Sequence, residues 1–321
     1  MLRIVLLFSC SILFCTAVQA KSWPERPITL VVPYPAGGGV DTAARIYSVA
    51  VSKILEQQVV VENRAGASGA IGAQAVVRSA PDGYTFLLSS PAEVLVSPIA
   101  GNSLPYDPEK DLTPIAFAGD TPLGIVAYPE RSPKSLDELI TNSRQQGAML
   151  NYGTPGNGSS MHFAGAALQA IAGVNWQHVP YKGAAPAVND VLGGQIDFAI
   201  TGLPPLVPHI KAGKLTLLAV TSAERFPLFA DVPSISELPS MKGYQFTNWL
   251  GLFGPAQLSS DIVQKLSAAF ENAAKDNAVR QQLQEAGWRP AVLGRDEFVQ
   301  FLAQERSRYQ TVRDKAGMIT K

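Results

Sequence analysis

The sequence predicts a two-domain α/β protein in which helices flank a mostly parallel sheet in each domain. Its 321 residues exceed what a single hydrophobic core usually serves. Short β-branched runs alternate with helical patterns, an order typical of parallel βαβ units. The succession of strand, glycine-rich loop and helix occurs twice, once in each half. With 46% hydrophobic and 16% charged residues, the chain is able to bury two cores.

Residues 1–20 have the pattern of a secretory signal peptide. Arg3 precedes the apolar stretch from Ile4 to Phe14, and small residues precede a cut after Ala20. We therefore expect an exported mature chain that begins at Lys21. Both cysteines lie in the leader, so the mature chain would have no disulfide, no Cys-ligated metal and no catalytic Cys. Beyond the leader, no apolar run approaches the ~20 residues that a membrane span needs.

The charge of the mature chain is nearly balanced. The full sequence has 26 basic and 26 acidic residues, and loss of Arg3 with the leader leaves 25 against 26. This balance does not indicate a nucleic-acid surface or a polybasic membrane anchor. We accordingly expect no nucleic-acid partner and no direct membrane insertion.

The first glycine-rich loop follows the apolar run Ile28 to Val32, which we expect to be a strand. After Gly37, Gly38 and Gly39, apolar residues resume with a helical period as far as Ala50. Glycines leave backbone N–H groups uncovered, and the first turn of a helix has unpaired donors and a partial positive charge. Such a corner would hold an anion without a basic side chain. The alternative is a tight turn that needs glycine only for positive φ.

Asp41, in the first turn of this helix, has two interpretations. Its carboxylate would cap the helix, the commoner role, or it would face a cleft and fix the loop around a ligand. The strand expected at Tyr84 to Leu88 ends at Ser89, Ser90 and Pro91. Because open α/β sheets bind ligands at the carboxyl ends of their strands, this loop should open beside the glycine loop.

Other elements follow from periodicity. They are a buried strand at Val59 to Val61, helices at Gly66 to Ser79, Ser135 to Gln146, Ala184 to Leu192 and around Leu206 to Lys211, and a helical tail at Ile262 to Lys275, Ala278 to Ala286 and Asp296 to Ala316. The tail is expected to pack on the first domain.

Two apolar runs, Ile115 to Ala118 and Leu123 to Tyr128, are expected to cross into the second domain, and Leu215 to Thr221 to cross back. The predicted division is residues 21–120 with 226–321 for domain 1 and 121–225 for domain 2, hinged near Gly119 to Leu123 and Thr221 to Arg225.

The second glycine-rich loop lies between a short strand at Leu150 to Tyr152 and a small-residue helix at Phe163 to Ala172. Its hydroxyls, on Thr154, Ser159 and Ser160, are able to donate to a carboxylate or cap the helix. One capping serine would not account for the whole polar cluster. We expect an anion-binding corner here too, facing the first one across a cleft.

Three further residues near this loop have competing interpretations. His162 is interpreted as a structural, hydrogen-bonded histidine, because no carboxylate or second histidine lies at metal-ligand spacing. Tyr181 and Lys182 follow a strand expected from His178, where a ligand would be lined, although Lys182 would equally suit a solvated surface.

Catalytic motifs are poorly supported. Ser68 and Ser159 lie beside glycines, but neither is in a G-x-S-x-G turn, and P-loop and dinucleotide-binding motifs are absent. We expect no cofactor and no metal. The alternative function is an exported hydrolase that uses Ser159 or Ser160 with His162, although no acid is placed to orient His162.

Several stretches, in order over nearly the whole mature chain, match one family. They include P-Y-P-A-G-G-G-V-D-T-A-A-R, V-E-N-R-A-G-A-S-G, A-P-D-G-Y-T, Y-G-T-P-G-N-G-S-S-M-H-F-A-G, H-V-P-Y-K-G-A-A-P-A, L-G-G-Q-I-D, H-I-K-A-G-K, L-A-V-T-S-A-E-R and V-P-S-I-S-E-L. By these stretches the chain resembles the exported solute-binding proteins of tripartite tricarboxylate transporters, the Bug (TctC) family. The resemblance implies a type II-like periplasmic-binding-protein fold that closes on a di- or tricarboxylate, an amino acid or an aromatic acid.

The resemblance also implies a ligand held largely by backbone groups and ordered water, in loops corresponding to Tyr34 to Asp41 and Gly153 to Ser160. The chain departs from the family pattern at Glu93, Ala166 and Thr201, so the ligand's identity is not transferable. The predicted ligand-binding residues are Tyr34, Ala36, Gly37, Gly38, Gly39, Asp41, Ser89, Ser90, Thr154, Gly156, Asn157, Gly158, Ser159, Ser160, His162, Tyr181, Lys182, Gly183 and Thr201.

The leading interpretation is a non-enzymatic, periplasmic, monomeric binding protein. It would deliver a small carboxylate to inner-membrane permease subunits or present it to a sensor kinase. A purely structural exported protein is a third interpretation, but it leaves the two polar loops unexplained.

Overall fold

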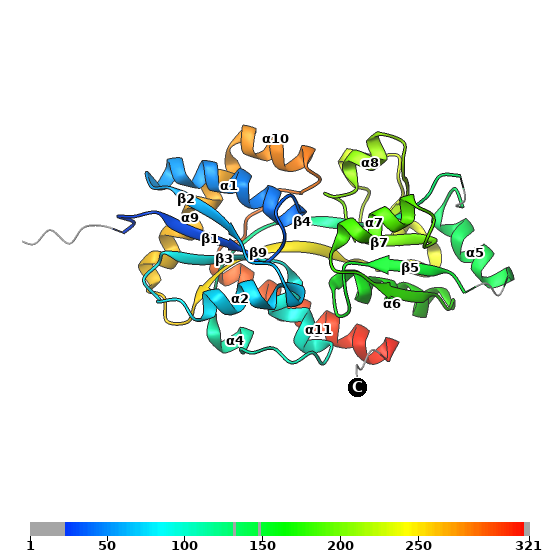
Figure 1. The fold of residues 1–321 in the computed structure, drawn as a ribbon, viewed down its shortest axis with the longest axis horizontal. Coiled ribbons are helices and arrows are strands. Elements are labelled where there is room, and N and C mark those ends of the chain that lie inside the picture. The colour runs from blue at the N-terminus through cyan, green and yellow to red at the C-terminus, as the bar shows by residue number, and fades with distance from the viewer. Residues whose placement is uncertain (1–22, 131–132, 147–148, 318–321) are drawn as a thin grey trace, which may run out of the picture.

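The computed structural model of the protein describes residues 23–130, 133–146 and 149–317. The described strands form one sheet along the length of the molecule, with helices on both of its faces (Figure 1). The predicted leader and its cleavage site lie outside the described residues. In the described part of the chain, no helix is long and apolar enough to span a bilayer.

Three parallel strands form the outer part of the first half. The elements are β1 (Ile28–Val32), α1 (Gly39–Leu55), β2 (Val59–Asn63), η1 (Ala67–Gly69), α2 (Ala70–Val77), β3 (Thr85–Ser89), η2 (Ala92–Val96), α3 (Ser97–Ile99) and α4 (Pro108–Asp111). β1 lies between β2 and β3. The prediction of a buried strand at β2 is wrong: β2 is the edge of the sheet, and Val60 is 49% exposed.

The second half repeats this arrangement. Its elements are α5 (Leu136–Gln146), β5 (Asn151–Thr154), α6 (Ser160–Ala172), β6 (Gln177–Pro180), α7 (Ala184–Leu192), β7 (Phe198–Gly202), α8 (Val207–Lys211) and β8 (Thr216–Val220). β5 lies between β6 and β7, and all three are parallel. The predicted order of strand, glycine loop and helix is therefore present in both halves.

Two long strands join the halves. β4 (Leu112–Ala127) pairs with β9 (Thr247–Pro255) and then continues into the second half, where it pairs with β7 and β8; all these pairs are antiparallel. The strand order is β2-β1-β3-β9-β4-β7-β5-β6, with β8 also beside β4. The sheet is therefore mixed, parallel within each outer group and antiparallel at the crossing.

The crossing differs from the predicted one. β4 unites the two apolar runs into one strand, because Gly119, with φ +118°, interrupts the pairing without ending the strand. The predicted return at Leu215 to Thr221 is wrong, since this segment is β8 and stays beside β4 in the second half. The chain returns through β9, which the sequence did not reveal because Gly251 and Gly254 interrupt its apolar run.

Residues 226–246 pack on the second half, although the sequence assigned them to the first domain. Ser234 bridges to Val220 of β8, and the Tyr244 hydroxyl donates to the Ala164 carbonyl of α6 at 2.7 Å. Three short turns lie in this stretch: η3 (Pro227–Phe229), η4 (Ile235–Glu237) and η5 (Pro239–Met241).

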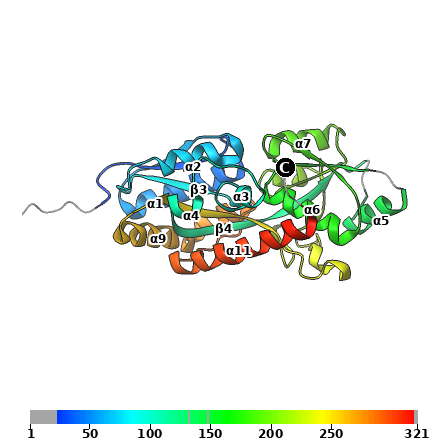
Figure 2. The same cartoon turned by 90° about the horizontal axis from the view of Figure 1, so that it is seen from below.

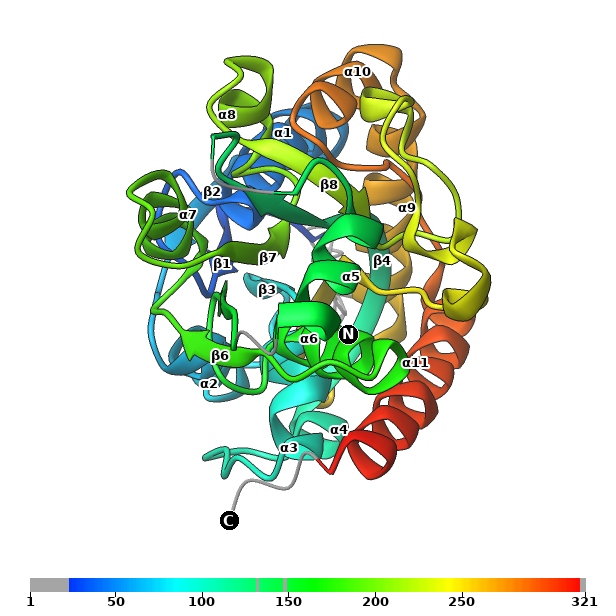
Figure 3. The ribbon, with the colours of Figure 1, turned by 90° about the vertical axis from the view of Figure 1, so that its right-hand side faces the viewer.

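The C-terminal helices divide between the halves. They are α9 (Ser260–Lys275), α10 (Asn277–Glu285) and α11 (Arg295–Ala316). α9 and α10 pack on α1, as expected, but α11 runs beneath both halves (Figure 2). When the molecule is viewed down its long axis, α9 and α11 lie on the opposite side from α2 and α7 (Figure 3).

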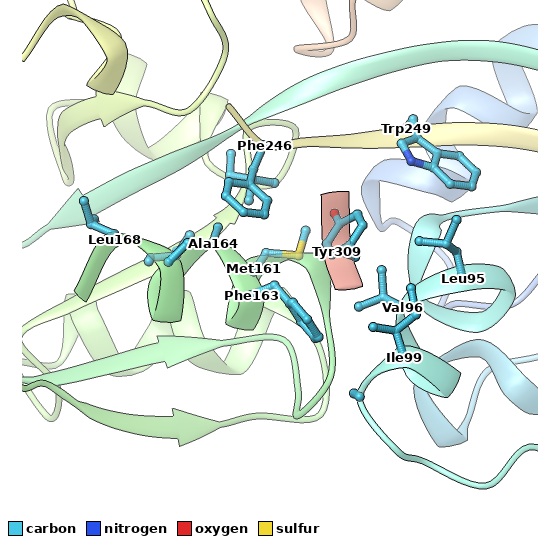
Figure 4. Close-up of a cluster of buried hydrophobic side chains, with 14 of the residues drawn as sticks. Leu95, Val96, Ile99, Met161, Phe163, Ala164, Leu168, Phe246, Trp249 and Tyr309 are labelled. Carbon is cyan, nitrogen blue, oxygen red and sulfur yellow. The ribbon is translucent and has the colours of Figure 1, made fainter. Parts of the chain in front are cut away.

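One apolar cluster joins the halves behind the sheet. The ring of Tyr309, on α11, lies 5.4 Å from that of Phe163 and 5.9 Å from that of Phe246. Leu95 and Ile99 of the first half belong to the same cluster (Figure 4). Because burial of apolar surface is the main stabilising term in folding, this back surface is the firm connection between the halves.

Candidate functional site

Asp41 fixes the first glycine-rich loop. Its carboxylate accepts the Gly37 N–H at 2.9 Å and Asn63 Nδ2 at 2.9 Å, and it pairs with Arg45 at 2.9 Å. The N-cap of α1 is Gly38, without a side-chain cap, so Asp41 holds the loop and does not cap the helix. Burial raises the pKa of this carboxyl, but the hydrogen bonds from Arg45, Gly37 and Asn63 outweigh burial and keep the pKa below its usual value. Asp41 is therefore ionised at neutral pH.

These bonds decide which donors the first loop offers an anion. The Gly37 N–H is used by Asp41, and the Gly38 N–H donates to the Pro35 carbonyl at 3.3 Å. What remains is the first helical turn from Gly39, whose N–H groups have no partner within the helix. Ala36 and Gly37 are exposed.

A buried carboxyl lies directly behind this loop. Glu93, on η2, accepts the Tyr34 hydroxyl at 2.6 Å, the Ser90 N–H at 2.9 Å and the Ser90 hydroxyl at 3.1 Å. Burial raises its pKa above the usual value, although these hydrogen bonds oppose the rise. The Tyr34 and Ser90 hydroxyls lie 2.6 Å apart, so the loop after β3 opens beside the glycine loop as predicted. The sequence marked Glu93 as unusual but did not reveal that it uses the hydroxyls of two predicted ligand residues.

Ser159 organises the second glycine-rich loop. It is the N-cap of α6: its Oγ accepts the His162 N–H at 3.2 Å and donates to the Gly156 carbonyl at 2.8 Å. The predicted cap is thus present. The N–H groups of Ser160 and Met161, which have no partner within the helix, are left for an anion.

Two imidazole rings stack behind this loop. The ring centroids of His162 and His178 are 3.9 Å apart, with 11° between the planes. His162 Nδ1 accepts the Gly158 N–H at 3.2 Å, and His178 Nε2 lies 2.7 Å from Thr154 Oγ1. Burial lowers the pKa of His162 to about 4; burial and the neighbouring His162 lower that of His178 to about 3. Both rings are neutral at pH 7. The structural hydrogen bond expected of His162 is present, whereas its partner His178 was missed because the two are distant in sequence.

The geometry does not support the hydrolase alternative. Ser159 Oγ bonds to two backbone groups and not to an imidazole nitrogen. The Ser160 hydroxyl donates to Met161 Sδ at 3.3 Å. His162 uses Nδ1 for the Gly158 N–H and faces another histidine, so these residues do not form the nucleophile, base and acid of a catalytic triad.

The remaining predicted site residues of the second half differ in their hydrogen-bond partners and in their burial. The Tyr181 hydroxyl donates to Asp190 Oδ2 at 2.6 Å, and burial, with that carboxylate, raises the pKa of Tyr181 to about 12. Thr201 is buried in β7 and donates to the Gly202 carbonyl at 3.0 Å. Partly or fully exposed positions are Asn157, Lys182 and Gly183.

The two loops lie at the boundary between the halves, which approach each other closely there. A Cβ at Gly39 would lie 3.0 Å from Pro204 Cβ, and one at Gly158 would lie 3.1 Å from Ala100 Cβ. Each of these pairs joins one half to the other. The boundary is therefore closed around the two loops, and glycine is the residue that permits these approaches.

A turn at residues 66–69 also reaches this boundary. A Cβ at Gly156 would meet Ser68 Oγ at 3.5 Å. Ala67 and Ser68 have φ of +47° and +52°, in the left-handed region that non-glycine residues rarely adopt. Such strain gathers at functional positions. The small-residue composition of this stretch instead suggested a helix from Gly66, and α2 begins only at Ala70.

Two cavities lie elsewhere. One of about 710 Å³ is lined by α9 and the start of α11, and one of about 350 Å³ lies between α4 and the later part of α11. Neither is lined by a predicted site residue. Over residues 23–130, 133–146 and 149–317, no three His, Cys, Asp or Glu side chains gather as metal ligands would.

Comparison with known proteins supports the fold. Residues 43–318 match the family described as "Tripartite tricarboxylate transporter family receptor". BugT of Bordetella pertussis is 33% identical over 318 residues, which cover 99% of this chain and 97% of BugT. An R. palustris protein solved with adipate aligns with TM-score 0.86 and 31% identity, over 92% of this chain and 99% of that chain. MatC from Rhodopseudomonas palustris with bound malate aligns with TM-score 0.81 and 31% identity, over 90% and 99%.

The mixed sheet, the two halves and the paired glycine loops define an α/β binding protein of the periplasmic type. The chain belongs to the tripartite tricarboxylate transporter receptor family, TctC, as its sequence resemblance predicted.

Proposed function

We propose that the protein is a non-enzymatic receptor that captures a small organic carboxylate between its two halves. The observation that carries the proposal is the pair of helix starts, α1 and α6, placed at one closed boundary. Each has unpaired N–H donors and a partial positive charge. The adipate and malate in two relatives support a carboxylate as the ligand class.

The carboxylate would be held by backbone N–H groups and hydroxyls, without an Arg. A helix start contributes ~0.3 to 2 kcal/mol toward an anion, and each hydrogen bond to a charged group ~1.5 to 3 kcal/mol. The proposed ligand-lining set is the one predicted from the sequence, from Tyr34 to Asp41, Ser89 and Ser90, Thr154 to His162, Tyr181 to Gly183 and Thr201.

We further propose that the two halves are domains that open and close around the ligand. At the back they share an apolar cluster and the strands β4 and β9, whereas at the front they meet through close glycine contacts. Bending of β4 and β9 would separate the halves first at the boundary where the two glycine-rich loops lie. Small-angle scattering with and without ligand should show contraction; an unchanged radius of gyration, with binding proven independently, would argue against closure.

The proposal includes export and a partner at the inner membrane. The leader would be cut after Ala20, and the mature monomer would work in the periplasm with permease subunits or a sensor kinase. N-terminal sequencing of the exported protein tests the first point, and light scattering tests the oligomeric state.

Ligand identification is the direct test. Mass spectrometry of small molecules released from the purified, denatured protein should yield an organic acid. Calorimetric titration should then show that the primary amide of that acid binds roughly a hundredfold more weakly, since each ~1.4 kcal/mol is tenfold. Incubation with the acid should give no product. Equal binding of acid and amide would refute the anion site.

A further inference from the structure

We propose that Pro204 is the stop that sets how far the two halves close on a ligand. Pro204 lies in the loop after β7, in the second half, and packs into a notch between Gly39 and Gly287 of the first half. This assignment rests on the proposed receptor function and deepens it, because it names a residue outside the predicted ligand-binding set that defines the closed position.

The notch is a fixed part of the first half. Gly39 begins α1, and Gly287 follows α10 with φ +86°. Trp288 joins the two walls: its side chain is 1% exposed within the apolar cluster of α1, and its Nε1 donates to the Gly39 carbonyl at 3.2 Å. Because one buried side chain links the residue after Gly287 to the Gly39 carbonyl, the two walls of the notch keep their spacing.

Pro204 leaves no room for a side chain on either wall. A Cβ at Gly39 would lie 3.0 Å from Pro204 Cβ and 3.2 Å from Pro204 Cγ, and a Cβ at Gly287 would lie 3.3 Å from Pro204 N. Gly39 does not have positive φ, and helix propensity would favour alanine over glycine in α1, so the approach of Pro204 is what requires glycine here. Packed atoms resist compression, so this contact would end the closing movement.

The notch and Pro204 are attached to β4 on either side of the crossing between the halves. The Thr121 hydroxyl donates to the Gly287 carbonyl at 2.7 Å, whereas the Leu203 N–H, next to Pro204, donates to the Pro122 carbonyl at 3.2 Å. Thr121 and Pro122 are consecutive residues of β4 and lie within the predicted hinge. Bending of β4 at this point would therefore lift Pro204 out of the notch as the halves open.

A disulfide across the notch tests the contact directly. Protein made without residues 1–20 contains no cysteine, so the pair Gly39→Cys and Pro204→Cys would have no other partner within the molecule. A disulfide needs a Cβ–Cβ distance of about 3.5 to 4.5 Å, and these two Cβ positions lie 3.0 Å apart, so a small shift suffices. Saturating adipate or malate should populate the closed state and speed oxidation by about tenfold. Gly39→Cys with Pro205→Cys is the matched control and should oxidise more slowly.

A cycle of variants separates a stop from a direct effect on the ligand. Gly39→Ala should weaken the binding of adipate or malate by about tenfold to a hundredfold, because its methyl group meets Pro204 before closure is complete. Adding Pro204→Gly removes the ring and should recover about tenfold or more of that loss. Adding Pro205→Gly instead should recover none of it. Calorimetric titration measures all four proteins.

Two results would overturn the stop. One is oxidation of the Gly39→Cys, Pro204→Cys pair at the same rate with and without an acid that the wild-type protein binds. The other is a Gly39→Ala loss that Pro204→Gly does not recover, since the methyl group would then act on the ligand or on α1 itself. Failure of the carboxylate site would appear separately, as absent binding in the titration of the wild-type protein.

Discussion

The two glycine-rich loops share a sequence pattern but differ in electrostatics. Behind the first lie two buried carboxyls, Asp41 and Glu93, which use many of the available donors. Behind the second lie two stacked, neutral imidazoles, His162 and His178. The same strand, loop and helix thus builds one corner that already contains negative charge and one that does not.

This difference shows which part of a site the local sequence controls. Glycines and a helix start produce the backbone donors in both halves. Whether an anion gains from these donors depends on side chains that reach the loop from other segments, such as Glu93 from η2 and His178 from β6. The second corner should therefore be the more important one for the ligand's carboxylate.

The largest expected effect comes from giving the second corner the charge of the first. In Ser159→Asp, the new side chain would still cap α6, because Asp is as good an N-cap as Ser, and stability should change by less than ~1 kcal/mol. The added charge should weaken carboxylate binding by about a hundredfold or more. Calorimetry and thermal melts measure the two quantities.

Ser159→Asn is the matched control for this change. Asn caps equally well, has nearly the shape of Asp and carries no charge. If the Asp and Asn variants bind the ligand equally, the carboxylate does not lie at the start of α6.

A smaller effect should come from crowding the boundary at the second loop. In Gly158→Ala, the new Cβ would lie 3.1 Å from Ala100 Cβ and 2.6 Å from Asn102 Nδ2, across the boundary. Such overpacking costs ~1 to 3 kcal/mol, which would weaken binding by about tenfold to a hundredfold if closure is needed. Gly173→Ala is the control, because Gly173 has a similar φ of +62° but nothing within 4 Å. Both variants should lose similar thermal stability, and only Gly158→Ala should lose affinity.

Much of the fold was predictable because it depends on local periodicity. The β-branched run before the first glycine loop, the short strand expected before the second loop and the helical period after each loop correctly predicted β1, β5, α1 and α6. The strands that cross between the halves were harder to predict from the sequence. β9 contains two glycines, and its pairing with β4 joins residues more than a hundred positions apart, which no local pattern encodes. The edge position of β2 likewise depends on strand order and not on the composition of β2 itself.

The site was predictable in its backbone but not in its side-chain partners. Glycine loops and the Ser159 cap follow from short-range rules. The bonds of Glu93 to Tyr34 and of His178 to Thr154 join segments that are separate in sequence, and a sequence does not show which side chains will meet. The left-handed turn at Ala67 and Ser68 was hidden because Ala and Ser favour helix or cap positions and rarely adopt positive φ.

The histidine pair should make stability depend on pH. Both pKa values in the folded protein, about 4 and about 3, lie below the ordinary 6.5. Between pH 6.5 and these lower values, the histidines bind protons in the unfolded chain but not in the native state. The native state is therefore at its most stable, with respect to these two histidines, above pH 6.5, and it loses stability as the pH falls toward 4. At pH 5 the loss should be about 2 kcal/mol for each histidine.

Urea unfolding at pH 7.5 and pH 5 measures this loss. The double variant His162→Asn, His178→Gln should lose less stability over this range than the wild type. His209→Gln, which changes the third histidine on α8, should behave as the wild type does. A double variant with an unchanged pH dependence would mean that these rings do not stay neutral in the fold.

The smallest effect is expected at the basic residue nearest the first loop. Arg45 pairs with Asp41 at 2.9 Å, four residues apart on α1, and its side chain is 54% exposed. An exposed ion pair of this spacing contributes ~0.3 to 0.5 kcal/mol, and Asp41 would keep its bonds to Gly37 and Asn63. Arg45→Gln should therefore cost less than ~1 kcal/mol of stability and change ligand affinity by no more than about twofold. Asp41→Asn, which removes the charge that fixes the loop, should cost more, ~1 to 3 kcal/mol. Abolished binding in a folded Arg45→Gln variant would place the ligand's carboxylate at Arg45, and the first corner would then be the anion site in place of the second.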